Sequence, residues 1–282
     1  MTKAELSAAR RPKLGQNFLT DRRIAERIVE AAGDLKERTA IEIGPGRGML
    51  TQMLARRARR LIAIELDRVL AAQLRMNFSR LPNVEILEAD ILKIEMPTLL
   101  GPRPGALAGI AASQHERACV VGNIPYYITS DILLWLFANH AFFDEIVLMT
   151  QMEVAERVAA VPGSRDYGLL SATTQLYASV EKLFTVPAGA FAPPPKVESA
   201  VLRLRLAPRW EDLRVEPAGF QEFLRASFAQ KRKTLLNNLK STYDDKQVRA
   251  AMIAAELRPD VRAEAVPLEK AAAVFRALAA AS

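Results

Sequence analysis

The sequence predicts an α/β fold, in which a mostly parallel sheet has helices on both faces and a small α-helical region follows it. Two observations support this prediction. Over residues 40–149, short apolar runs alternate with stretches of helical periodicity, the pattern of repeated strand–helix units. Beyond residue 207 the pattern is helical to the end. We therefore expect one domain over residues 1–207 and a second over 208–282, with Ala207-Pro208-Arg209 as the linker.

Seven strands are expected in the first domain. Five are apolar runs at residues 40–43, 61–65, 84–87, 118–121 and 145–149, and two more, 178–186 and 199–206, suit a closing antiparallel pair. Helices are expected at 21–32 (with Asp21 as its cap), 49–58, 68–78 and 130–138, and in the second domain at 220–229, 232–239, 246–255 and 268–280. Residues 101–117 contain two prolines and three glycines, so we expect a surface loop there.

Composition excludes several classes of protein. The chain has a single cysteine, Cys119, which rules out a disulfide framework. Its two histidines, His115 and His140, are far apart and cannot form a common zinc site with that cysteine. The N-terminus has no apolar segment, and no run approaches the roughly 20 apolar residues of a membrane span. We expect a cytoplasmic, monomeric protein without a metal. Its net charge of +7 comes from the two ends of the chain, which suits a polyanionic partner.

A glycine-rich turn, residues 42–48, joins the first expected strand to the following helix. Its spacing is G-x-G-x-G after an acidic residue, whereas a dinucleotide fingerprint would need its third glycine at Met49. Gly44 and Gly46 allow a ligand to approach the backbone closely, and Gly48 allows the helix to pack closely on the strand. This pattern favours an S-adenosylmethionine pocket. The alternative is a glycine turn with packing duties only.

Two acidic residues follow the next expected strands. Glu65 ends the second strand and can accept hydrogen bonds from both ribose hydroxyls of a cofactor, while Asp90 follows the third and can accept from the adenine amine. Ligands of open α/β sheets bind at the carboxyl ends of the strands, which is where both acids lie. If each acid is considered without the other motifs, the alternative is a solvated carboxylate on the protein surface.

The sequence Asn123-Ile124-Pro125-Tyr126 follows the fourth expected strand. The Asn123 carboxamide oxygen can accept one N–H of an aromatic amine, and the carbonyl of Ile124 or Pro125 can accept the other. Both hydrogen bonds strengthen as the nitrogen gains positive charge, so they favour the transition state of methyl transfer. Asn and Pro are also common turn residues, so the alternative is a simple β-turn.

Two aromatic residues are candidates for stacking on the base. Tyr126 belongs to the same motif, and Phe191 precedes a run of three prolines after Ala192. We count Asn123, Pro125, Tyr126 and Phe191 as the expected catalytic set. The alternative for Phe191 is a hydrophobic plug on a proline-stiffened loop.

The target base must be unpaired or flipped out to reach such a pocket, so phosphate contacts are expected nearby. Lys231, Arg232 and Lys233 form a basic run at an expected helix start. At the other end of the chain, Lys13, Arg22 and Arg23 are further candidates. Any one of these cations, taken individually, is better explained as plain surface charge.

Together these motifs resemble the small-subunit (16S) ribosomal RNA adenine dimethyltransferases. The resemblance runs in order through residues 13–19, 42–48, Glu65, Asp90, 123–126, 191–199 and 228–239. It implies a class I methyltransferase domain with a seven-stranded Rossmann-like sheet and a helical RNA-binding domain. It also implies that four methyl groups pass from S-adenosylmethionine to N6 of two adjacent adenosines in the 3′-terminal hairpin of 16S rRNA, with a role in small-subunit assembly.

The resemblance adds Asn17 and Leu19 to the cofactor pocket, beside Gly44, Gly46, Glu65, Asp90 and Asn123. Without it, the segment around Asn17 suits a helix cap with a hydrophobic staple. The chain departs from the family at Tyr127, where Asn is frequent, and in the long segment 101–117. Both departures affect substrate approach more than catalysis.

Two alternatives remain. The related large-subunit (23S) rRNA adenine methyltransferases, which confer macrolide resistance, share the cofactor and Asn-x-Pro-Tyr motifs, but residues 191–204 and 228–239 favour the small-subunit family. The second is a ribosome-assembly factor that binds RNA without methylating it. The intact Gly44, Glu65, Asp90 and Asn123 argue against it.

Overall fold

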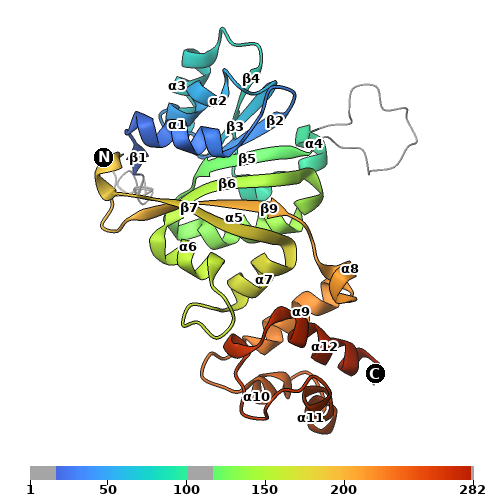
Figure 1. Cartoon of the computed structure of the whole chain (residues 1–282). Coiled ribbons are helices and arrows are strands. Elements are labelled where there is room, and N and C mark those ends of the chain that lie inside the picture. Colours follow the sequence, from blue (N-terminus) through green and yellow to red (C-terminus); the bar gives the residue numbers. More distant parts are fainter. Residues whose placement is uncertain (1–16, 101–116, 281–282) are drawn as a thin grey trace, which may run out of the picture.

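The computed structural model describes residues 17–100 and 117–280. Its main sheet has seven strands in the order β4-β3-β2-β5-β6-β9-β7, the first five of them parallel (Figure 1). β9 is antiparallel to β6 and β7. The strands are β2 (Thr39–Ile43), β3 (Arg60–Glu65), β4 (Val84–Glu88), β5 (Ala118–Asn123), β6 (Phe143–Gln151), β7 (Ala178–Val186) and β9 (Ser199–Leu206). The predicted α/β class and the closing antiparallel pair are confirmed.

Helices connect and cover these strands. The longer helices before β9 are α1 (Arg22–Ala31), α2 (Met49–Leu54), α3 (Arg68–Phe78), α4 (Met96–Leu100), α5 (Thr129–Ala138), α6 (Met152–Ala159) and α7 (Leu169–Tyr177). After β9 come α8 (Trp210–Leu213), α9 (Pro217–Ser227), α10 (Leu235–Leu239), α11 (Asp245–Ala254) and α12 (Leu268–Ala279). Asp21 caps α1 as predicted, since its carboxylate accepts from the amides of Arg23 and Ile24.

Alternate residues of the parallel strands face opposite sides of the sheet, so the apolar core has two parts. In β2, Ile41 and Ile43 belong to the larger cluster, which includes α5–α7 and the C-terminal helices. Ala40 belongs to the other cluster, with α1 and α2. Because both faces are covered, most residues of β2, β3 and β5 are apolar, which explains why these strands stand out in the sequence.

The C-terminal helices α8–α12 gather below the sheet in Figure 1. α9 and α12 pack against α7, and Gln221 of α9 forms a hydrogen bond with the Tyr177 hydroxyl. The chain enters this region at Ala207–Arg209, so the predicted linker lies where β9 gives way to α8.

Several predicted boundaries are wrong. The helix expected at 49–58 ends at Leu54, because the chain must turn into β3 and the Asn83 side chain donates to the carbonyls of Ala55 and Ala58 in that turn. The helix expected at 232–239 starts only at Leu235, with Thr234 as its cap. The basic run 231–233 therefore lies in the turn before α10 and not on the helix.

Other elements were not predicted. α6 and α7 lie between β6 and β7, where no helix was expected. β1 (Phe18–Leu19) and β8 (Phe191–Ala192) form a separate two-stranded sheet from residues more than 170 positions apart. A strand of two residues has too little pattern to be found in a sequence. The predicted loop 101–117 lies outside the described residues except for Arg117.

Candidate active site

The glycine turn between β2 and α2 forms the floor of the site. Gly44, Gly46 and Gly48 all have positive φ, at 70°, 56° and 86°, a conformation that other residues adopt only with strain. A Cβ on Gly44 would lie 3.4 Å from the main-chain oxygen of Asn123, so this turn and the Asn-x-Pro-Tyr segment approach closely. A Cβ on Gly48 would meet Leu74 Cδ2 at 2.9 Å. Gly48 thus allows packing against α3, not against the strand as we expected.

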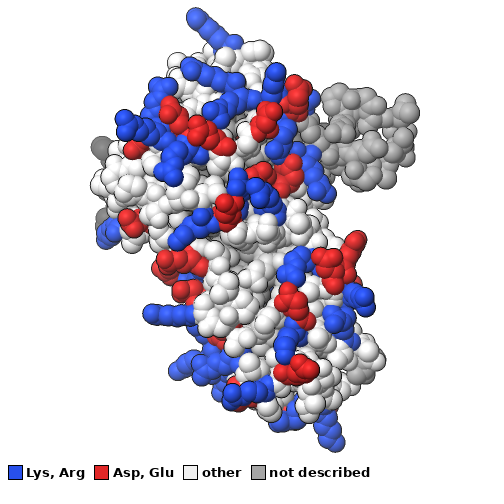
Figure 2. All heavy atoms as spheres, in the orientation of Figure 1, with Lys and Arg blue, Asp and Glu red and all other residues white. Residues whose placement is uncertain are grey.

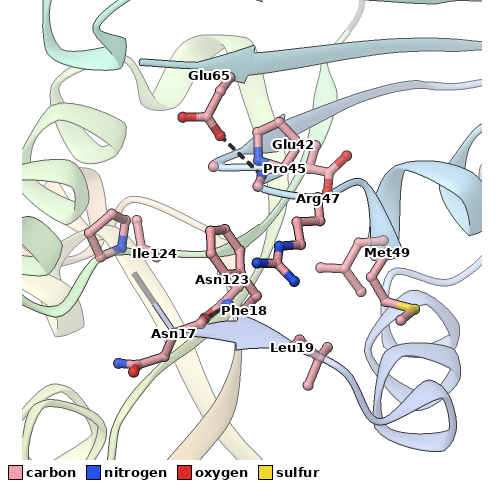
Figure 3. A pocket seen from close by; sticks show the side chains of 14 residues that line it. Asn17, Phe18, Leu19, Glu42, Pro45, Arg47, Met49, Glu65, Asn123 and Ile124 are labelled. Atoms are coloured by element: carbon pink, nitrogen blue, oxygen red, sulfur yellow. Dashed lines mark hydrogen bonds between the residues drawn. The ribbon is translucent and has the colours of Figure 1, made fainter. Parts of the chain in front are cut away.

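A cavity opens above this turn (Figure 3). Of the residues expected at the cofactor, the cavity is lined by Asn17, Leu19, Gly44, Gly46, Glu65 and Asn123. Four further residues that line it were not expected there: Phe18, Glu42, Arg47 and Met49.

Glu65 is held at the end of β3 with its carboxylate facing the glycine turn. Its Oε2 accepts from the Gly46 amide at 3.0 Å, and its Oε1 accepts from the Asp67 amide at 2.9 Å. The side chain is only 4 % exposed, and burial raises its pKa, against the effect of these two amides. The remaining lone pairs of both oxygens are available to a ligand with two neighbouring hydroxyls.

Glu42 is a second acid in the cavity wall. It is 1 % exposed, and its Oε2 has no hydrogen-bond partner among the described residues. Burial raises its pKa to about 8, and Thr51 on α2 offsets only part of this effect. An unpartnered buried oxygen in a cavity wall suits a ligand that donates a hydrogen bond. The sequence signal for Glu42 was its place two residues before Gly44, the first glycine of the motif.

The segment 17–19 closes one side of the cavity. β1 pairs with β8, so Leu19 lies opposite Phe191. A Cβ on Gly46 would come 3.0 Å from the Phe18 ring, and the Arg47 guanidinium lies 4.5 Å from the centre of that ring. In Figure 3 the Arg47 side chain reaches into the cavity between Phe18 and Met49.

The Asn123 carboxamide has a defined orientation. Its Nδ2 donates to the main-chain oxygen of Asn17 at 3.3 Å. This hydrogen bond turns the NH₂ group toward Asn17, and the Oδ1 atom is the acceptor that remains for a substrate. The pairing joins the first described residue of the chain to the end of β5, which no sequence pattern predicts.

The structure also decides between the two main-chain carbonyls of the motif. The Pro125 oxygen accepts from the Ile128 amide at 3.2 Å and from the Thr129 hydroxyl at 3.3 Å. Among the hydrogen bonds of the described residues, the Ile124 oxygen has no donor. Ile124 therefore presents the available acceptor, and Pro125 shapes the turn that exposes it.

A second cavity adjoins the first and shares Gly44, Glu65 and Pro125 with it. Asp90 lines this second cavity, where one of its oxygens accepts from the Leu92 amide at 3.1 Å. Its apolar walls are formed by Ile43, Ile64, Leu66, Ala89, Ile91, Ile128 and Ile132. Tyr127, the departure noted in the motif, is 59 % exposed at this cavity.

Other predicted site residues do not meet at the cavity. Phe191 is 3 % exposed, belongs to the core with Leu19, and lines neither cavity, so its ring is packed in the protein interior here. The Tyr126 side chain and all of Lys13 lie outside the described part of the structure.

The remaining expected RNA contacts are exposed but far from one another. Arg22 and Arg23 begin α1, where Arg22 pairs with Glu26 at 3.0 Å. Lys231, Arg232 and Lys233 are exposed in the turn before α10, in the lower region of Figure 1. Any RNA that touched both sets would extend along the length of the molecule.

Neither a metal cluster nor a membrane helix is found in the residues 17–100 and 117–280. No three His, Cys, Asp or Glu side chains there are grouped to hold a metal ion. None of the helices in these ranges is long and apolar enough to cross a bilayer.

Comparison with known proteins identifies relatives over nearly the whole chain. The ribosomal RNA small subunit methyltransferase A of Koribacter versatilis is 58 % identical over 270 residues, 96 % of this chain and 95 % of the relative. The enzyme of the same name from Acidobacterium capsulatum is 51 % identical over 276 residues, 98 % of this chain and 93 % of the relative.

Solved structures show the same architecture. The 23S rRNA methyltransferase ErmE has a TM-score of 0.68 and 31 % identity, over 93 % of this chain and 100 % of that one. A dimethyladenosine transferase from Plasmodium falciparum has a TM-score of 0.71 and 23 % identity, over 91 % and 95 %, and supports the fold alone. The family model for ribosomal RNA adenine dimethylase matches residues 8–280. The chain therefore belongs to the ribosomal RNA adenine dimethylase family.

Proposed function

We propose that this protein dimethylates N6 of two adjacent adenosines in the 3′-terminal hairpin of 16S rRNA, with S-adenosylmethionine as methyl donor, during assembly of the small ribosomal subunit. The observation that carries the proposal is the pair of free acceptors, Asn123 Oδ1 and the Ile124 carbonyl, at the rim of the cavity. The two relatives at 58 % and 51 % identity act on the small subunit by name, which favours that substrate over large-subunit RNA.

The cavity residues fit S-adenosylmethionine. Glu65 offers two oxygens to the ribose hydroxyls, and the second cavity, with apolar walls and Asp90, suits the adenine. The unpartnered Glu42 Oε2 suits an ammonium group, and Asn17, Leu19, Gly44, Gly46 and Asn123 complete the wall. When bound, the cofactor supplies an electrophilic methyl group on its sulfonium.

The protein's contribution to the reaction is hydrogen bonding and alignment. Asn123 Oδ1 accepts one N–H of the adenine amine, and the Ile124 carbonyl accepts the other. Both acceptors draw the nitrogen lone pair out of conjugation and become stronger as positive charge grows on that nitrogen. This scheme needs no strong base. Alignment of the amine with the methyl group supplies the rest of the acceleration.

The second methyl transfer makes a different demand on the same acceptors. After the first, the amine has one N–H left, so one of the two acceptors must release its partner and leave room for a methyl group. Asn123 is fixed through Nδ2 to Asn17, and the Ile124 carbonyl is fixed by the Pro125 turn. The amine therefore has to rotate between the two transfers. Tyr126 is proposed to stack on the base throughout.

The target adenosine belongs to a folded ribosomal RNA. The protein binds this RNA as a monomer in the cytoplasm. We propose that residues 1–207 form the catalytic domain and 208–282 an RNA-binding domain. Lys231, Arg232 and Lys233 in the turn before α10, with Lys13, Arg22 and Arg23 near the other end, are the proposed phosphate contacts. Phe191 is proposed to stack on the target adenine only if binding of that base separates β8 from β1.

The test is methylation by the purified protein of small and large subunits isolated from cells without this modification. We expect label from S-adenosylmethionine in small-subunit RNA, recovered as N6,N6-dimethyladenosine by mass spectrometry. Label confined to large-subunit RNA would instead support the macrolide-resistance activity. Binding of small subunits without any methylation, and without calorimetric binding of S-adenosylhomocysteine, would indicate a non-catalytic assembly factor.

A further inference from the structure

A compact basic surface lies at the edge of the sheet opposite the active site. It is formed by three turns, residues 33–38, 55–60 and 79–83, that precede β2, β3 and β4. Hydrogen bonds join these turns to one another. The Arg59 amide donates to the carbonyls of Leu35 and Arg38, and Asn83 Nδ2 donates to those of Ala55 and Ala58, at 2.9 and 3.0 Å. The three turns therefore form one rigid platform.

This platform is strongly basic. Its three turns contain seven Lys or Arg residues and two acidic residues, Asp34 and Glu37. Arg60 and Arg38 pair with Glu85 and Asp144 on the neighbouring strands. Four further cations are exposed and make no ion pair with a described residue, and these define the amino-edge basic surface: Lys36, Arg56, Arg57 and Arg80. In Figure 2, Lys and Arg side chains project from the end where the α3–β4 loop lies.

The distance between this surface and the active site limits what the surface can bind. β3 starts at Arg60 and ends at Glu65, so at about 3.3 Å per residue the two edges of the sheet are roughly 17 Å apart. The amino-edge basic surface therefore cannot touch the nucleotide in the active site. Arginines on turns that are hydrogen-bonded to one another are suited to phosphate oxygens, which guanidinium groups bind in a bidentate manner.

We propose that the amino-edge basic surface binds the sugar–phosphate backbone of a second rRNA segment, separate from the hairpin that is methylated. The inference rests on the proposed function, since it needs a large folded RNA as substrate. It predicts that a short hairpin carrying the target adenosines engages only part of the RNA-binding surface, whereas the assembled subunit engages both edges of the sheet.

The first test compares two triple variants that remove the same net charge. Arg56→Ala/Arg57→Ala/Arg80→Ala alters the surface, and Arg165→Ala/Lys182→Ala/Arg262→Ala removes three other exposed cations as a control. We expect the first variant to bind small subunits about tenfold more weakly at ~0.1 M salt, with a shallower dependence on salt. Both variants should methylate a short hairpin RNA like the wild type. Equal subunit affinity of both triple variants and the wild type would overturn the proposal.

A second test identifies the partner directly. Cys119, the only cysteine, is 0 % exposed. Arg57→Cys therefore gives one accessible thiol for an iron chelate that cleaves nearby RNA, and the labelled wild type gives the background. We expect cleavage of small-subunit RNA outside the methylated hairpin. No cleavage above background, or cross-linking from this position to ribosomal protein alone, would refute an RNA contact. If the wild type methylates no RNA at all, the proposed function fails instead.

Discussion

The two edges of the same parallel sheet differ sharply in how they hold charge. At the carboxyl edge, Glu42 and Glu65 are buried and face a cavity between backbone turns with positive φ. At the amino edge, Arg56, Arg57 and Arg80 are exposed on turns that line neither of the two cavities described above. Parallel strands place all their incoming turns at one edge and all their outgoing turns at the other. The carboxyl edge can therefore form a small-molecule site, while the amino edge presents an exposed charged surface to a large partner.

The difference has an energetic consequence. Buried carboxylates at the carboxyl edge are costly unless a ligand or an amide satisfies them, so each is expected to matter strongly and individually. Exposed cations at the amino edge are solvated and screened, so each contributes little and the group matters together. The following changes test this contrast, from the largest expected effect to the smallest.

Removing the acceptor at the carboxyl edge should affect catalysis most. Asn123→Ala deletes the Oδ1 acceptor and should lower turnover about 10²–10³-fold, as loss of a transition-state hydrogen bond does elsewhere. Single-turnover methylation of small subunits measures this effect. S-adenosylhomocysteine should still bind, by calorimetry, within about threefold of the wild type, because the acids that hold it remain.

Asn139→Ala is the matched control, since Asn139 donates to the Trp135 carbonyl far from the cavity. It should turn over like the wild type. Parallel loss of turnover and cofactor binding in Asn123→Ala would mean that the Asn123–Asn17 hydrogen bond is needed mainly to build the pocket.

The next largest effect is expected on cofactor binding. In Glu65→Gln, one carboxylate oxygen becomes an NH₂ group, which must face the amide of Gly46 or of Asp67. The variant loses one charged hydrogen bond, and its new NH₂ group faces an amide N–H that is also a donor. The affinity for S-adenosylhomocysteine, measured by calorimetry, should therefore fall about 10- to 100-fold. Glu88→Gln, at the end of the neighbouring strand and outside both cavities, is the control. Unchanged affinity in Glu65→Gln would remove Glu65 from the cofactor site.

Neutralising the turn before α10 sharpens the comparison between the two basic regions. Lys231→Ala/Arg232→Ala/Lys233→Ala should weaken subunit binding about tenfold at ~0.1 M salt and flatten its salt dependence. This turn lies in the C-terminal helices and the amino-edge basic surface lies on the sheet, so the two triple variants should combine additively in free energy. If affinity is unchanged at every salt concentration, this turn does not contact RNA.

The last expected effect is on stability as pH changes, and not on catalysis or binding. The pKa of Glu42 is raised from 4.5 to about 8, so the folded protein holds this proton more tightly than the unfolded chain does. The contribution of Glu42 to stability is therefore complete below about pH 4.5 and is lost as pH rises toward 8. Glu42→Gln cannot ionise, so the melting temperature should fall less between pH 5 and 8.5 than in the wild type.

The measurement is thermal unfolding of the cofactor-free protein across that range. Glu95→Gln, which changes an exposed acid at the start of α4, should follow the wild-type profile. If the Glu42→Gln profile also runs parallel to the wild type, Glu42 is already ionised in the folded protein and the argument from its burial is wrong.

Sequence reasoning succeeded where the signal was local. The central parallel strands β2, β3 and β5 are mostly apolar because both faces of the sheet are covered, and α3 was predicted at its observed bounds, Arg68–Phe78. The glycine turn, Glu65, Asp90 and Asn123 were found because each follows a strand that could itself be recognised. Glu42 was visible as the acid before the turn but received no role, since its burial and its unpartnered oxygen are properties of the folded protein.

The sequence by itself determined the seven strands of the main sheet in their order along the chain, the spacing of the glycine turn, and the positions of Glu65, Asp90 and Asn123 at or after the ends of β3, β4 and β5. These depend on residues close together in the chain. Only the tertiary structure decided that Asn17 orients Asn123, that the Ile124 carbonyl is available while that of Pro125 is not, and that Phe191 is buried against β1. It also brought three separate basic turns onto one edge of the sheet. The physical reason is that hydrogen-bond partners and neighbouring turns come together through strand pairing across 25 to more than 100 residues, and periodicity along the chain has no information about which distant groups will meet.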